Sequence, residues 1–168
     1  MPRRASARDG GALPAADQVT EVFVRTPYAG RKIREWARRD EEFVRRAAFA
    51  MIAEVAWHDK TAPDRAFEPF FTLITRAAGD ERNYVKKAVN WALRNIGKRN
   101  AALNRRAVAV ARELQASDSR AARWIAADAL RELTSEAVQA RLRAAPEPAP
   151  GPTGPRRRRS PSRPTRRA

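Results

Sequence analysis

The stretch YVKKAVNWALRNIGKRN, residues 84–100, decides how the rest of the chain is interpreted. Its apolar residues recur every three or four positions, which is the period of an amphipathic helix. At about 100° per residue, one side of this helix carries Val85, Val89, Ala92 and Ile96. The opposite side carries Lys87, Asn90, Trp91, Arg94 and Lys98. We therefore predict a helix over residues 82–98, with one face in the core and a cationic, aromatic face turned outward.

Two other segments align with this helix and indicate an internal repeat. Residues 43–47 (FVRRA) match residues 84–88 (YVKKA), and residues 121–125 (AARWI) follow at a similar distance. An apolar column continues through the copies at Val55, Ile96 and Leu133. A period of about 40 residues with two helices per period is typical of HEAT and armadillo repeats. The first helices of the pairs are expected at about residues 28–39, 64–78 and 101–115.

These pairs predict an all-α protein, built as a short right-handed superhelix of HEAT-like antiparallel helix pairs, an α-solenoid. Val19–Val24 is expected to be the second helix of a further pair whose first helix is missing, so the chain is expected to begin inside the architecture. We place the repeat domain at residues 17–145. Residues 1–16 and the Pro/Arg-rich tail 146–168 are predicted to be disordered, because neither can bury enough apolar surface.

The charge balance favours a polyanionic partner. The chain has 35 Lys and Arg against 19 Asp and Glu, a net charge of +16. The tail contains seven arginines and one glutamate, so the remainder still carries +10. Neutralising phosphates with such cations releases condensed counterions, which favours binding to nucleic acid. General solubility is the alternative explanation of the excess.

Other classes of function are excluded by residues that the chain lacks. It has no cysteine and one histidine, His58, which excludes disulfides, thiolate zinc sites and sites with several histidines. No apolar run reaches the roughly 18 residues needed to cross a bilayer, and the amino terminus does not resemble a secretory signal. We expect a cytoplasmic, nucleoid-associated monomer without metal or cofactor.

The second helices of the pairs are predicted to line one groove. The wheel that exposes Trp91 also places Arg46 and Trp57 together on the equivalent helix of the first repeat copy, with Ala50 and Ala53 between them. On the equivalent helix of the third copy it exposes Trp124, Asp128 and Arg131. A concave basic surface with flat aromatic rings suits a phosphate backbone with sugars or bases beside it. The alternative is that each tryptophan is a half-buried contact between stacked pairs.

Several polar residues receive structural roles. Asp80 and Asp118 precede second helices and are expected to be N-caps. Gly97 is expected to end its helix. His58, Asp59 and Lys60 are expected at a helix terminus rather than in a catalytic site.

Three runs of the sequence resemble the DNA alkylation repair family, over about residues 17–142. They are FVRRAAF at 43–49 with AWHDK at 56–60, the stretch 84–100 quoted above, and ARWIAADALREL at 122–133. The resemblance implies a HEAT-like superhelix that grips duplex DNA. It also implies excision of cationic N3- or N7-alkylpurines without a cofactor, by a carboxylate that stabilises positive charge developing on the sugar.

Carried onto this sequence, the resemblance assigns three catalytic residues. Arg46 matches the family's phosphate-gripping arginine, and Trp91 matches its sugar-packing tryptophan. Asp17 lies near the position of the catalytic aspartate. The sequence departs from the family there, because Leu13 stands where the family has a tryptophan, and the preceding repeats are expected to be missing. Two alternatives follow: Asp17 is the catalytic residue, or catalysis has been lost.

Three functions therefore stay open at the level of sequence. The chain is an alkylpurine DNA glycosylase acting on duplex DNA, a non-catalytic DNA-binding repeat protein, or a helical scaffold for a protein partner. The two DNA hypotheses share the same binding residues: Arg46, Lys87, Asn90, Trp91, Arg94, Lys98, Trp124 and Arg131.

Overall fold

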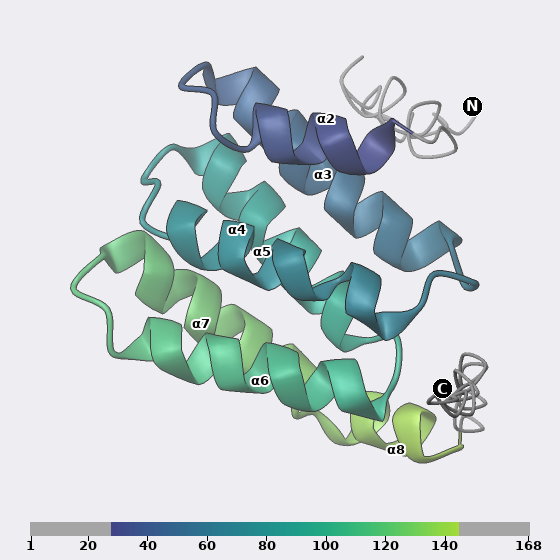
Figure 1. Cartoon of the computed structure of the whole chain (residues 1–168). Helices are drawn as coiled ribbons and strands as arrows, with labels where there is room; N and C mark the ends of the chain where they lie inside the picture. Colours follow the sequence, from purple (N-terminus) through teal and green to yellow (C-terminus); the bar gives the residue numbers. More distant parts are fainter. Residues whose placement is uncertain (1–27, 145–168) are drawn as a thin grey trace, which may run out of the picture.

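The computed structural model describes residues 28–144, and this part of the chain is helical without a β-strand (Figure 1). Its α-helices are α2 (Ala29–Trp36), α3 (Glu42–His58), α4 (Glu68–Ala77), α5 (Asn83–Gly97), α6 (Ala101–Gln115), α7 (Arg120–Leu133) and α8 (Glu136–Ala144). A short 3-10 helix, η1 (Asp64–Ala66), precedes α4. The all-α prediction is confirmed. The predicted segments 1–16 and 146–168, together with Asp17 and Val19–Val24, lie outside the described residues.

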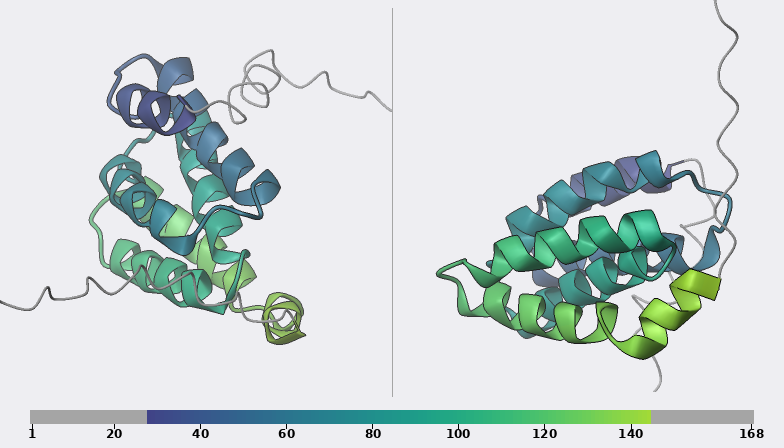
Figure 2. Two further views of the ribbon diagram at one scale, coloured as in Figure 1. Left: turned by 45° about the vertical axis from the view of Figure 1, so that its right-hand side comes forward. Right: turned by 90° about the horizontal axis from the view of Figure 1, so that it is seen from below.

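The helices form two layers (Figures 1 and 2). Helices α2, α4 and α6 lie in one layer, and α3, α5 and α7 lie in the other. Each helix of the first layer packs on its successor, α3 packs along α5, and α5 packs along α7. The second layer therefore places the three segments aligned in the sequence side by side. Helix α8, which the sequence did not predict separately, follows α7 and packs against it.

The core consists of the apolar faces that helical periodicity predicts. Val85, Val89, Ala92 and Ile96 of α5 are all fully buried. In the apolar column of the repeat, Ile96 and Leu133 are fully buried and Val55 is partly buried. The remaining core contains many alanines, which let neighbouring helices approach closely.

Two of the expected helix caps are wrong. Helix α7 begins after Ser119, whose hydroxyl accepts a hydrogen bond from the Ala122 amide at 3.2 Å, so Asp118 is not the cap. Helix α5 follows Arg82 without a side-chain cap, and Asp80 instead binds arginines. Both aspartates lie one or two residues too early to reach the first turn in the way that N-caps do.

No helix in residues 28–144 is long and apolar enough to cross a membrane.

Candidate nucleic-acid interface

A surface cleft of about 250 Å³ lies between α3 and α5, which pack along each other. Its lining residues are Arg46 and Ala50 from α3, and Tyr84, Lys87, Ala88 and Trp91 from α5. Residues three, four or seven positions apart share one side of a helix, which explains how each helix contributes to the same opening. The α3–α5 cleft thus brings together three residues predicted to bind DNA: Arg46, Lys87 and Trp91.

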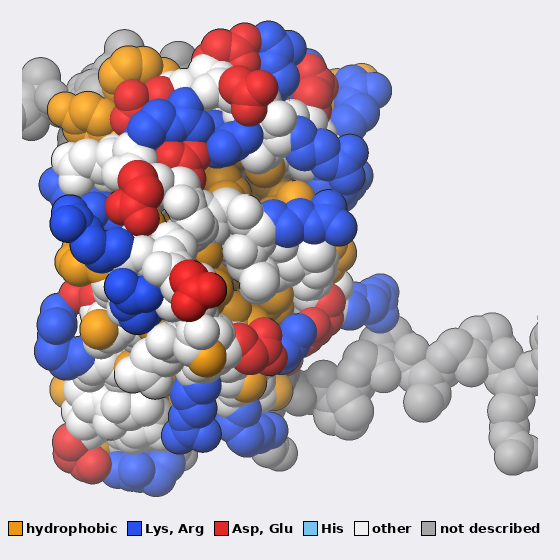
Figure 3. All heavy atoms as spheres, turned by 90° about the vertical axis from the view of Figure 1, so that its left-hand side faces the viewer, with side chains coloured by type: hydrophobic (Ala, Val, Ile, Leu, Met, Phe, Trp, Pro, Cys, Tyr) orange, Lys and Arg blue, Asp and Glu red, His pale blue; other side chains and the backbone are white. Residues whose placement is uncertain are grey.

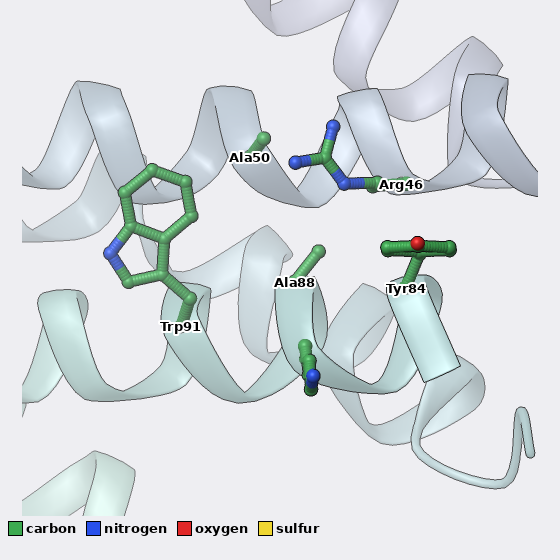
Figure 4. Close-up of a pocket in the computed structure, with 6 residues that line it drawn as sticks. Arg46, Ala50, Tyr84, Ala88 and Trp91 are labelled. Atoms are coloured by element: carbon green, nitrogen blue, oxygen red, sulfur yellow. The ribbon is translucent and has the colours of Figure 1, made fainter. Parts of the chain in front are cut away.

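Small side chains form the floor of the α3–α5 cleft. Ala50 of α3 and Ala88 of α5 both line the cleft and are 2% and 5% exposed. Figure 4 shows the guanidinium of Arg46 between Ala50 and Tyr84 with Ala88 below it, and Trp91 toward the opposite end of the cleft from Tyr84. A larger residue at either alanine would fill the space in which Arg46 lies.

Aromatic rings form the ends of the cleft. Tyr84 is half exposed, and its ring centroid lies 5.7 Å from that of Phe43, an exposed residue in the first turn of α3. Trp91 is partly buried and lines the cleft. Lys87 and Trp91 therefore lie on the same surface of α5, away from the buried valines. Cations above a small apolar floor, with aromatic rings beside them, suit a phosphate next to a sugar or base.

The other two tryptophans of the predicted groove do not line this cleft. Trp124 of α7 is 41% exposed, and the Lys86 ammonium lies 5.1 Å from its ring centroid. Trp57, near the end of α3, is 53% exposed and has Lys60 at the same distance. Each forms a cation–π pair of a kind that contributes about 0.5–1 kcal/mol at an exposed site.

The remaining predicted DNA-binding residues of α5 contact carboxylates of α7. We call Asn90 and Arg94 of α5 and Lys98 directly after it, with Asp128 and Glu132 of α7, the α5–α7 ion cluster. The Asn90 amide is 3% exposed and donates to Asp128 at 2.6 Å. Arg94 donates to Asp128 at 3.1 Å and also pairs with Glu132, to which Lys98 donates at 2.7 Å. Arg131 pairs with Asp128 and stays largely exposed.

A second charge network lies at the edge that carries the α2–α3, α4–α5 and α6–α7 connections. Figure 3 faces this edge and shows basic and acidic side chains intermixed on it. Asp80 accepts from Arg82 at 2.6 Å and from Arg45 at 3.0 Å, and Arg82 also donates to the Asp40 carbonyl. The hydrogen bonds from Arg82 and then Arg45 lower the pKa of Asp80 from 3.8 to about 2, against the opposing effect of burial. This network joins the α2–α3 connection to the α4–α5 connection.

The lining of the cleft, within the part of the chain that the structure describes, includes no carboxylate. Asp17, the predicted catalytic carboxylate, lies outside the described residues. Within residues 28–144, no Asp or Glu lines the α3–α5 cleft, and no group of three or more His, Asp or Glu could hold a metal ion. His58 ends α3, as expected, with its Nε2 atom 3.0 Å from Glu54.

A comparison with known protein families shows which family the chain belongs to. The family model described as DNA alkylation repair enzyme matches residues 14–133. The chain belongs to this family. The match covers most of the chain and both helices of the α3–α5 cleft. It indicates a role in alkylation repair, with DNA as the substrate that the family's name implies. No curated protein and no solved structure matches the chain.

Two features of this surface were not predicted from the sequence. Tyr84, the first residue of the motif YVKKA, lines the cleft. Its position three residues before Lys87 and seven before Trp91, which places it on the same side of the helix, was the available signal. Glu132 of α7 pairs with Arg94 and Lys98. Its position directly before Leu133, which aligns with Ile96 in the repeat, was the available signal.

Proposed function

We propose that this protein binds duplex DNA at the α3–α5 cleft in the repair of alkylation damage. The observation that carries the proposal is the placement of Arg46, Lys87 and Trp91 around one opening with an alanine floor. The lysine is exposed and the tryptophan is partly buried. Phosphate contacts position a protein on a duplex without reading its sequence, so this site fits recognition of the backbone.

The wider arrangement of helices supports the same proposal. We infer that the pairs α2–α3, α4–α5 and α6–α7 continue as the HEAT-like right-handed superhelix expected from the repeat. In such stacks one helix of each pair lines the concave surface. The layer α3, α5 and α7 contains the cleft and is the surface against which DNA would lie.

Binding to a duplex over a range of salt concentrations tests the proposal. The affinity should fall steeply with salt, because each phosphate contact contributes a slope of about −0.9 in log K against log salt. Lys87→Ala should reduce the slope by about one unit with little change in thermal stability. Arg112→Ala removes the same charge from the exposed surface of α6 and serves as the control. A protein that does not bind duplex at low salt is better described as a scaffold for another protein.

A second proposed activity is excision of cationic alkylpurines, with Asp17 as the carboxylate. It is favoured by the family match, which begins at residue 14 and therefore includes Asp17. An alkylated purine that already carries positive charge is a good leaving group. A fixed negative charge beside the sugar then stabilises the positive charge that develops as the base departs.

Release of 7-methylguanine from alkylated duplex tests this second activity. The wild-type protein should release the base, and Asp17→Asn should lose most of the activity while binding unmodified duplex equally well. Equal release by the two proteins would show that Asp17 is not the catalytic carboxylate. Binding without release by the wild-type protein would leave DNA binding as the function.

A further inference from the structure

The α5–α7 ion cluster lies beside the α3–α5 cleft on the same helix. Trp91 lines the cleft, and Arg94 and Lys98 follow at one and two turns along α5. On α7, Asp128 and Glu132 are also one turn apart. The spacing on the two helices therefore matches. Asp128 contacts Asn90 and Arg94, and Glu132 contacts Arg94 and Lys98.

We propose that Asp128 and Glu132 mark the edge of the DNA-binding surface by occupying Arg94 and Lys98 in place of phosphates. The inference rests on the proposed function of the α3–α5 cleft. The two carboxylates then limit how much of the layer formed by α3, α5 and α7 contacts DNA. The expected contact includes Lys87 and Trp91 of the cleft, and it stops before Arg94, in the last turn of α5.

Burial makes the carboxylates effective competitors. The side chains of Lys98 and Asp128 are 18% and 19% exposed, and Arg94 and Glu132 are only slightly more open. Partly buried ion pairs are screened by salt much less than exposed ones. Burial acts to raise the pKa of Glu132, yet hydrogen bonds from Lys98 and Arg94 hold it below its ordinary value of 4.5. Glu132 is therefore ionised at neutral pH, and a phosphate would have to displace a bound anion.

Lys87 provides the contrast on the same helix. It is exposed, lines the cleft, and forms no ion pair with the residues described. A phosphate can contact Lys87 without displacing a carboxylate. Lys87 thus differs from Arg94 and Lys98 in being available to a phosphate, and not in the sign of its charge.

Removing the two carboxylates provides the first test. Asp128→Asn with Glu132→Gln keeps the shape of both side chains and releases Arg94 and Lys98. The salt slope for duplex binding should become steeper by about two units, since two more phosphates are contacted. The control is Glu113→Gln with Asp118→Asn, which changes the net charge equally at exposed positions on α6 and shortly after it. This control should leave the slope unchanged.

A variant of unchanged net charge provides the second test. It combines Arg94→Gln and Lys98→Gln with the two carboxylate substitutions, so the whole cluster becomes neutral. Binding at the wild-type affinity and slope is expected, provided that thermal melting shows a folded protein. A slope reduced by about two units would show that Arg94 and Lys98 contact phosphates in the wild-type protein, which overturns the inference.

The two tests separate this inference from the proposed function. If wild-type protein binds duplex and the Asp128→Asn, Glu132→Gln variant binds no more steeply than its control, the inference alone is wrong. If neither protein binds duplex at low salt, the proposed function is wrong and the inference is overturned with it.

Discussion

Gly97 ends α5 at a point where α6 and α7 both pack against it. A Cβ atom at this position would lie 2.7 Å from Leu133 Cδ2 and 2.9 Å from Ala107 Cβ. Both neighbours are fully buried, so neither can move aside easily. Gly97→Ala should therefore destabilise the protein by about 1–3 kcal/mol, as overpacked cores do. Urea unfolding measures the change, and a midpoint equal to that of the wild type would contradict it.

The sequence could predict the position of Gly97 but not its role. We expected a glycine that ends a helix, and α5 does end at this residue. None of the described glycines has a positive φ angle, however, so the backbone does not require glycine here. The requirement comes from Ala107 and Leu133, which belong to α6 and α7. A pattern within one helix cannot show a contact made by two others.

Trp91 allows the apolar part of DNA binding to be separated from the ionic part. Trp91→Leu keeps an apolar side chain and removes the flat ring that opens into the cleft. Aromatic packing on a nucleotide contributes about 1–3 kcal/mol and involves no counterion release. We expect weaker binding with the wild-type salt slope, measured by titration at several salt concentrations. A reduced slope would mean that the substitution displaces Arg46 or Lys87.

At the scale of the element, α5 shows how far helical periodicity reaches. The wheel separated the buried Val89 from the exposed Lys87 correctly, because that division depends only on the angle between residues. It grouped Asn90, Arg94 and Lys98 with Lys87, although the structure pairs all three with α7. The angle around one helix does not determine which neighbouring carboxylate each cation meets.

The α4–α5 connection should give the protein a specific sensitivity to acid. Asp80 has its pKa lowered from 3.8 to about 2 by Arg82 and Arg45. A lowered pKa stabilises the folded state above pH 4 and loses this contribution as the pH falls toward 2. Asp80→Asn should therefore be less stable than wild type at pH 6, and the difference should shrink between pH 4 and pH 2. Urea unfolding at several pH values measures it, and a constant difference would contradict the prediction.

At the scale of the whole molecule, the sequence predicted the helix pairs but not which charged residues the pairs bring into contact. The expected first helices at 28–39, 64–78 and 101–115 contain α2, α4 and α6, because breakers and periodicity are local signals. The pairing of the α5 cations with the carboxylates of α7 could not be predicted, since it depends on how one helix pair is rotated against the next. The net charge of +16 is therefore not spread evenly over the predicted groove.

The Arg-rich tail accounts for a large share of that charge and should add affinity without specificity. Residues 146–168 lie outside the described part, and seven of them are arginines. Each arginine that contacts a phosphate adds about 0.9 to the salt slope, so deleting 146–168 should weaken binding and flatten the slope by several units. The loss caused by Lys87→Ala should be the same in the full and shortened chains, because distant sites contribute additively. An unchanged slope would mean that the tail does not contact DNA and that the folded helices supply all of the ionic affinity.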